Sequence, residues 1–123
     1  MKFRDYISND FETSESHYLK TLRSRYYRCH KDKAFEGLRQ VVSDLKAIVK
    51  YEDKVRGEII FENRNFSATA TVVSPTYSET AIDFKVTTFR ILPLGKGKKL
   101  IEDFYKRLDN VLPYKGVSLY SGR

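Results

Sequence analysis

Residues 66–74 read FSATATVVS, and this stretch decides the fold class. Its apolar residues at positions 66, 68, 70 and 72 alternate with polar residues at positions 67, 69 and 71. Because successive side chains of a strand point to opposite faces of a sheet, the pattern predicts a strand with one buried face and one polar face. Such a sheet needs a second layer of structure over its apolar face.

Further strands are predicted on both sides of this stretch. Residues 56–62 (RGEIIFE) precede it across the turn 63–65, where asparagine tolerates left-handed backbone angles. Residues 80–92 (TAIDFKVTTFRIL) follow it across the turn 74–78, which contains Pro75. Short connections of this kind predict an antiparallel meander. A fourth strand is predicted at 19–29 and placed at the sheet edge, because arginines fall on both of its faces.

Two amphipathic helices are predicted, at 33–50 and at 98–112. Apolar residues recur in each at intervals of three and four, which places them on one side of the helix. In the first helix these residues are Ala34, Phe35, Leu38, Val41, Val42, Leu45, Ile48 and Val49; in the second they are Leu100, Ile101, Phe104, Tyr105, Leu108, Val111 and Leu112. Asp32 is predicted to cap the first helix, and Pro113 to end the second.

Together these elements predict a single α+β domain over residues 19–123, preceded by a loosely ordered segment, 1–18. The expected sheet is antiparallel and has four strands, or five if residues 116–120 add a short one. The expected order is β-α-β-β-β-α, with both helices on the same sheet face. A chain of 123 residues buries enough surface to fold without a disulfide or a structural metal.

The composition argues against several classes of protein. The one cysteine, Cys29, excludes an internal disulfide and favours a reducing compartment. The N-terminal residues lack the apolar core of a signal peptide, and nowhere do about 18 apolar residues run together as a membrane-spanning helix requires. We therefore expect a cytoplasmic protein with no transmembrane segment.

Catalytic and metal-binding signatures are weak. His17, Cys29 and His30 are too few and too poorly placed for a zinc site, since neighbouring residues of a strand point to opposite faces. Cys29 could act as a nucleophile only with a nearby base, and His30 or His17 would have to serve. The simpler interpretation is that Cys29 is a small apolar residue at the end of a strand. We expect no enzyme activity, metal or cofactor.

The charge pattern supplies the strongest functional hint. The chain has a net charge of +7, and its basic residues gather in segments 20–33 and 96–107. Arginines interleaved with tyrosines can hold phosphates and stack on bases, whereas lysines at a helix start oppose the helix dipole unless an anion binds there. The candidate residues for binding an anion or a nucleic acid are Arg23, Arg25, Tyr27, Arg28, Lys96, Lys98 and Lys99. A solvated basic surface without a ligand is the simpler alternative.

Three functions remain open at this level. The first is a non-enzymatic binding or interaction module of unspecified partner, which includes a homodimer formed through an edge strand or the open sheet face. The second is a nucleic-acid-binding protein that uses both basic segments, provided that they converge on one face. The third is a carrier of a small ligand or lipid, with a pocket between sheet and helices among the aromatic residues of the expected core.

Overall fold

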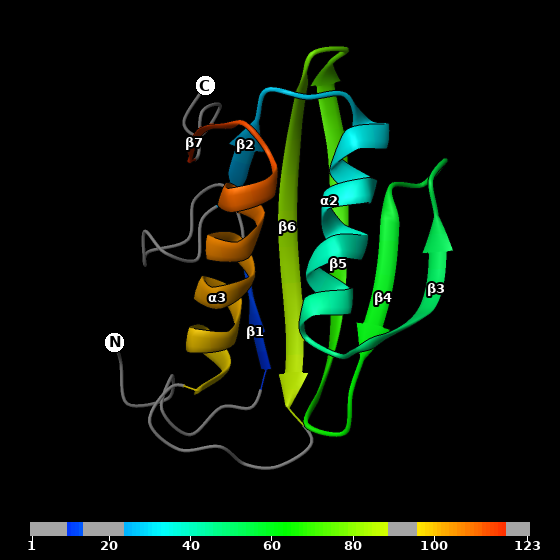
Figure 1. Ribbon diagram of the computed structural model, residues 1–123, viewed down its shortest axis with the longest axis vertical. Helices are drawn as coiled ribbons and strands as arrows, with labels where there is room; N and C mark the ends of the chain where they lie inside the picture. The colour runs from blue at the N-terminus through cyan, green and yellow to red at the C-terminus, as the bar shows by residue number, and fades with distance from the viewer. Residues whose placement is uncertain (1–9, 14–23, 89–95, 118–123) are drawn as a thin grey trace.

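The computed structural model describes residues 10–13, 24–88 and 96–117 of the chain (Figure 1). Side-chain surroundings are described for all of these except residues 10–12, 96, 97 and 117. The helices and strands, in chain order, are β1 (Asp10–Glu12), β2 (Arg25–Tyr27), α2 (Lys31–Asp44), β3 (Ile48–Asp53), β4 (Glu58–Glu62), β5 (Phe66–Thr76), β6 (Glu79–Thr88), α3 (Lys96–Val111) and β7 (Tyr114–Val117).

The strands form one antiparallel sheet in the order β3-β4-β5-β6-β2-β7. A short further strand, β1, also pairs with β6, at residues 85–87, while β2 pairs with it at residues 80–82. β1 and β2 therefore lie end to end along the same edge of β6. The predicted α+β class, single antiparallel sheet and pair of helices are confirmed, but the predicted strand number and order are wrong.

Both helices cover the same face of the sheet, as Figure 1 shows. The alternating apolar residues of β5 and β6 form the sheet side of the core, and the apolar faces of α2 and α3 pack against them. The largest fully buried side chains are Tyr27, Tyr105, Phe35, Phe61, Phe84, Phe104, Leu38, Ile59, Ile82, Ile101 and Leu108. Periodicity alone thus predicted correctly which face of each helix would be buried.

The first helix ends six residues earlier than predicted. α2 stops at Asp44, and the backbone N–H groups of Lys46 and Ala47 donate to the carbonyls of Ser43 and Val42. These two bonds form a Schellman motif, in which the residue after the cap adopts a left-handed conformation. Here that residue is Lys46, with φ of 55°. Glycine usually occupies this position, so the sequence carried no stop signal.

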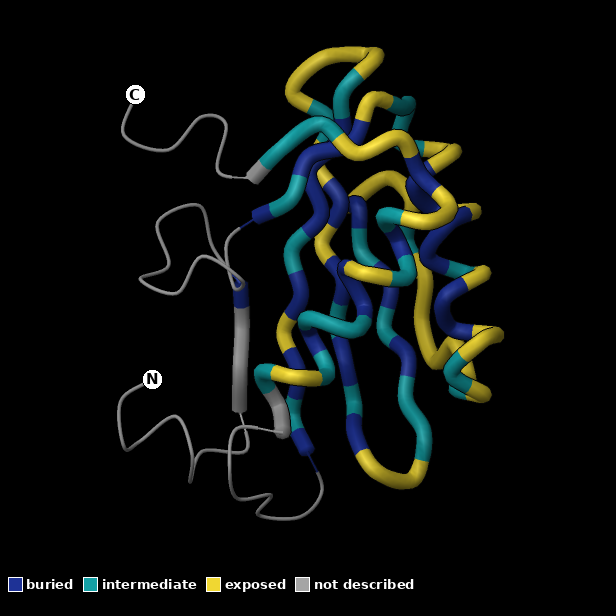
Figure 2. The backbone as a smooth tube through the Cα atoms, turned by 60° about the vertical axis from the view of Figure 1, so that its left-hand side comes forward, coloured by how far each residue is buried: buried dark blue, intermediate teal, exposed yellow. Residues whose placement is uncertain are grey.

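Residues 48–50, which were predicted to be helical, instead begin β3. This is one of the strands that the sequence did not predict. Ile48, Val49 and Tyr51 are β-branched or aromatic and pair readily with β4. β3 is exposed along almost its whole length, whereas buried and partly buried residues alternate along β4 (Figure 2).

The strand predicted at 19–29 is present in part, but its placement at the sheet edge is wrong. Only β2 is observed within it, and β2 pairs with β6 on one side and with β7 on the other. Residues 19–23 lie outside the described residues. β7 begins at Tyr114 rather than at residue 116, and residues 118–120 of the predicted fifth strand are likewise outside the described part of the chain.

Two other regions bear on the sequence predictions. The turn at 63–65 forms as predicted, with the Asn63 side chain accepting the backbone N–H groups of Asn65 and Phe66. Residues 10–13 fall in the segment expected to be loosely ordered, and here β1 pairs with β6 while Thr13 is buried. Neither α2 nor α3 has the length and hydropathy that crossing a bilayer requires.

Candidate nucleic-acid interface

Two of the candidate binding residues, Arg25 and Tyr27, hold α3 against the sheet. They stand opposite Ile82 and Thr80 of β6 and therefore point to the helix-covered face. The Asp109 carboxylate of α3 accepts a bond from Arg25 Nη1 at 2.5 Å and from the Tyr27 hydroxyl at 2.8 Å. We call Arg25, Tyr27 and Asp109 the α3 clamp.

The surroundings of the clamp leave it little room for a ligand. The Arg25 guanidinium lies 5.0 Å from the Tyr105 ring centroid and 5.3 Å from that of Tyr114, within reach of cation–π contact with both rings. Tyr27 is fully buried, and burial followed by the nearby Asp109 charge raises the pKa of its hydroxyl. The sequence suggested that Tyr27 stacks on bases, but its ring has no exposed face to offer.

The lysines at the start of α3 lie far from this arginine. Lys98 forms an ion pair with Glu102 at 2.7 Å, and Lys99 is exposed. Ten residues of helix separate Lys99 from Asp109, a rise of about 15 Å. Lys98 and Lys99 lie in the first turn of α3, whereas β2 with Arg25 lies beside its C-terminal end (Figure 1). The described candidate residues of the two segments therefore do not converge, because Arg25 lies beside one end of α3 and Lys98 and Lys99 lie at the other. Arg23 and the Lys96 side chain lie outside the described residues.

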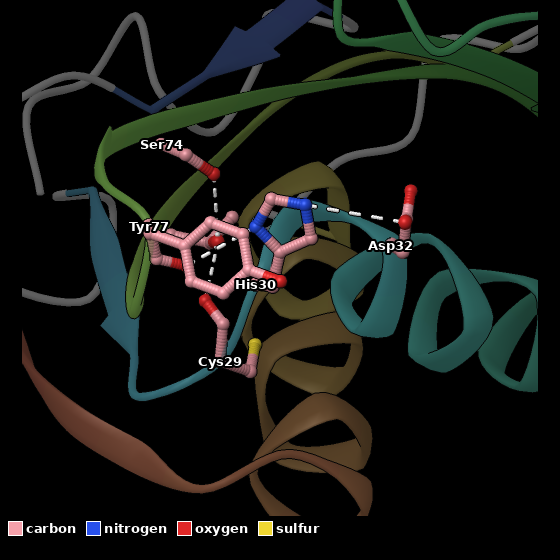
Figure 3. A network of polar contacts seen from close by, with 6 residues as sticks. Cys29, His30, Asp32, Ser74 and Tyr77 are labelled. Atoms are coloured by element: carbon pink, nitrogen blue, oxygen red, sulfur yellow. Dashed lines mark hydrogen bonds and ion pairs between the residues drawn. The ribbon is translucent and has the colours of Figure 1, made fainter.

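A different set of cations converges at the end of the molecule where α2 begins. Three segments meet there: 28–33, the turn 54–57 and the hairpin 74–80. His30 stacks on Tyr77 with ring centroids 4.1 Å apart, and its Nδ1 lies 3.1 Å from the Tyr77 carbonyl oxygen (Figure 3). Lys31 Nζ donates to the Val55 carbonyl at 3.3 Å. We call these three segments the basic end.

The basic end has a surplus of unpaired positive charge. Its cations are Arg28, Lys31, Lys33, Lys54 and Arg56. Within the described part of the chain, none of these five forms an ion pair, and all except Lys31 are exposed. Its acidic side chains have other contacts: Asp32 lies 3.9 Å from His30, and Glu79 pairs with Lys115. An anionic partner would therefore meet cations that are already clustered and solvated.

A glycine fixes the turn that supplies two of these cations. Gly57 has φ of +74°, and a Cβ there would lie 2.1 Å from the Val72 carbonyl oxygen. Its N–H donates to the Asp53 carbonyl, and its own carbonyl accepts the Val72 N–H. The Lys54–Arg56 turn is thereby fastened to β5. Sequence reasoning missed Lys54 and Arg56, because only the pairing of β3 with β4 brings their turn beside α2.

The start of α2 adds a modest positive potential to the same end. The helix begins at Lys31, and its N-cap residue, His30, makes no side-chain capping bond. The predicted cap, Asp32, lies instead within the first turn, where its carboxylate still interacts favourably with the helix dipole. The prediction was wrong because the helix starts two residues earlier than its apolar periodicity indicates.

Cys29 belongs to this end but does not have the properties of a nucleophile. Burial raises the pKa of its thiol, outweighing the effects of Thr80 and Lys33, so the reactive thiolate is disfavoured. The ring nitrogens of His30 lie near Tyr77 and Asp32 (Figure 3), so no contact activates the thiol through His30. Within residues 10–13, 24–88 and 96–117, no three metal-binding side chains gather in one place.

The open face of the sheet is not basic. Strand register aligns Asp53, Glu58, Thr71 and Asp83 in one row across four strands, with Lys85 in the next row. The Asp83 carboxylate accepts the hydroxyls of Thr13 and Ser24 at 2.6 and 2.7 Å. Carboxylates in this row repel phosphates, so the open face is a poor surface for nucleic acid.

The aromatic residues that might have lined a ligand pocket pack against one another. The Phe104 ring lies at centroid distances of 5.6, 5.5 and 5.1 Å from Phe61, Phe66 and Phe84. Such spacings are those of a closely packed core. No protein-family model, curated protein sequence or solved structure matches this chain. The functional argument therefore depends on the geometry of the basic end.

Proposed function

We propose that this protein is a non-enzymatic binding module that binds single-stranded nucleic acid through its basic end. The observation that carries the proposal is the convergence, around an exposed aromatic stack, of five cations that form no ion pair with any described residue. The lone cysteine fits the reducing cytoplasm as the place of action.

Tyr77 favours nucleic acid over an acidic protein as the partner. Its side chain is 79% exposed although one face of the ring rests on His30. A ring supported in this way loses little freedom when a base stacks on its outer face, and base–aromatic stacking contributes about 1–3 kcal/mol per base. An acidic protein needs only the cations and would gain little from the ring.

The charges around Tyr77 define how the strand would lie. Lys54 and Arg56 stand on one side of the α2 start, and Lys33 stands on its first turn. In this arrangement, phosphates that follow a stacked base would contact these side chains, all three of which are exposed to solvent. Contacts with phosphates carry no base identity, so we expect binding with weak sequence preference and strong dependence on salt.

The test is fluorescence anisotropy with labelled single-stranded RNA and DNA of about 10–15 nucleotides, at several salt concentrations. The variant Lys33→Gln/Lys54→Gln/Arg56→Gln should bind at least about tenfold more weakly. Its log–log salt slope should be smaller by about 2, because single strands contribute about 0.7 per phosphate contact. The matched control, Lys85→Gln/Lys99→Gln/Lys106→Gln, removes three exposed cations from other surfaces and should retain most of the affinity.

Tyr77→Ala completes the test. It should weaken binding about tenfold or more with an unchanged salt slope, since it removes stacking and no charge. Equal losses in the two triple variants would contradict a localised site. Binding of polyglutamate as tight as that of the oligonucleotides, insensitive to Tyr77→Ala, would show that an acidic protein is the partner instead.

A further inference from the structure

His30 lies against Tyr77 at the basic end and is the one histidine among the residues that the structure describes (Figure 3). Its ring stacks on the Tyr77 ring at a centroid distance of 4.1 Å, and its side chain is 37% exposed. Histidine is the side chain whose ordinary chemistry changes its charge between about pH 5 and 8. A group that can change its charge in this range therefore lies at the centre of the proposed binding site.

We propose that protonation of His30 strengthens the binding of single-stranded nucleic acid, so that the affinity of the basic end rises as the pH falls. This inference rests on the proposed function and names the group that regulates it. The neutral ring gives the weaker binding state, and the protonated ring gives the tighter one. By reciprocity, a bound strand favours uptake of a proton by His30.

The contacts of the two ring nitrogens decide where that proton goes. Nδ1 lies 3.1 Å from the Tyr77 carbonyl oxygen, which can only accept, so Nδ1 carries a hydrogen in the neutral ring. Nε2 is then the nitrogen that holds the lone pair, and it lies 3.9 Å from the Asp32 carboxylate. A second proton at Nε2 leaves the bond to Tyr77 intact and faces Asp32. Protonation therefore requires no rearrangement of the stack.

A charged ring changes the site in two ways that favour a strand. An imidazolium against the face of Tyr77 adds a cation–π attraction, which holds the exposed ring in place for stacking on a base. The same charge attracts the Asp32 carboxylate, which lies in the first turn of α2 and otherwise repels phosphates. Pairing with His30 weakens that repulsion.

The charges around His30 oppose one another, so bound phosphates can decide its state. The charged or titratable groups that surround it are Arg28, Cys29, Lys31, Asp32 and Lys33 on its own segment, Lys54 and Arg56 on the turn 54–57, and Tyr77 and Glu79 on the hairpin 74–80. Glu79 is paired with Lys115 at 2.7 Å. The cations disfavour a further positive charge, whereas Asp32 favours it. Phosphates bound to the cations add negative charge and shift this balance toward the protonated ring.

The experiment is fluorescence anisotropy with oligothymidylate and oligouridylate at constant salt, from about pH 8 to about pH 5.5. These oligonucleotides keep a constant charge in that range if they lack terminal phosphates and carry a label that does not titrate. The native chain should bind about fivefold or more tightly at the lowest pH. His30→Phe keeps a ring against Tyr77 but takes up no proton, so its affinity should not change with pH. His30→Gln should behave in the same way.

His17→Gln is the matched control, because it removes the other histidine of the chain and should retain the native pH dependence. Circular dichroism at both ends of the pH range shows which variants are folded. A native affinity that changes by less than about twofold overturns this inference and leaves the proposed function standing. So does a native pH dependence that persists in a folded His30 variant. Absence of binding at every pH overturns both proposals.

Discussion

Arg25 and Arg28 stand in the same arginine- and tyrosine-rich segment, yet their surroundings are opposite. Arg25 lies under α3, with an ion pair to Asp109 at 2.5 Å and cation–π contacts to Tyr105 and Tyr114. Arg28 is exposed at the basic end, with no ion pair among the described residues. The first arginine contributes to stability, and the second is available to a partner.

The difference teaches that residue type does not separate a structural cation from a binding one. A cation already paired with a carboxylate has little left to offer a phosphate, because the new contact must displace the old one. The two tyrosines follow the same rule, since Tyr27 is buried against Asp109 and Tyr77 is exposed on His30. The α3 clamp and the basic end should therefore respond differently to the following changes.

The largest effect should come from Gly57→Ala, which breaks the basic end. The new Cβ meets the Val72 carbonyl, and an alanine at φ of +74° is strained. We expect the free energy of unfolding to fall by about 3 kcal/mol or more, together with a loss of oligonucleotide binding. Urea denaturation and anisotropy measure the two effects. Val55→Ala in the same turn is the control, because Val55 is 92% exposed and should tolerate the change.

Asp109→Asn should break the clamp and leave the basic end intact. Arg25 and Tyr27 would lose a charged acceptor shared by both, and the free energy of unfolding should fall by about 2–3 kcal/mol. Oligonucleotide binding should not change. Asp103→Asn removes a more exposed pair with Arg107 on the same helix and should cost less than about 0.5 kcal/mol. Equal losses from both variants would show that the clamp has no special role.

Alkaline pH should weaken the clamp without a substitution. Burial raises the pKa of Tyr27 and of Tyr105 above the ordinary value of 10.0, so both stay protonated in the fold and ionise when it opens. Stability from these groups is therefore complete below pH 10 and falls above it, by about 1.4 kcal/mol for each tyrosine at pH 11. Urea denaturation across this range measures the decline, and Tyr27→Phe should make it shallower. A decline equally steep in Tyr27→Phe would contradict this assignment.

The smallest effect is expected at Lys46, a lysine that belongs to neither region. Its left-handed conformation suits glycine, so Lys46→Gly should raise the free energy of unfolding by about 0.5–1 kcal/mol. Lys50→Gly is the matched control and should lower it, because glycine weakens a strand. A loss of stability in both variants would show that the charge or side chain of Lys46 matters more than its backbone.

Much of the fold was predictable because the deciding signals are local. The alternation in residues 66–74 correctly indicated the buried face of β5, and the stripes of the two helices correctly indicated the core except at Ile48, Val49 and Val111, which are exposed. The end of α2 was not predictable, since Ile48 and Val49 fit a helical stripe as well as a strand. The choice between them depends on the Lys46 conformation and on pairing with β4, and neither is visible in the order of residues.

The candidate site was predictable only in part. Arg28 was chosen for its sequence context and lies on the basic end, whereas Arg25 and Tyr27 were chosen for the same reason and lie in the clamp. Lys54 and Arg56 were missed, because nothing in their local sequence marks a binding site, and Arg56 was assigned to the predicted strand 56–62. Their proximity to Lys31 arises from the path of β3 and β4 around the start of α2.

By itself, the sequence determined the fold class, the apolar faces and the net positive charge of this protein. Buried residues recur every two positions in a strand and about every 3.6 positions in a helix, so a stretch of ten residues is enough to show which face is buried. The tertiary structure alone decided which charges are neutralised. Arg25 and its carboxylate partner are 84 residues apart in the chain, and Lys31 reaches a carbonyl 24 residues away. Electrostatic pairing acts across space, and only the folded chain determines which charges become neighbours.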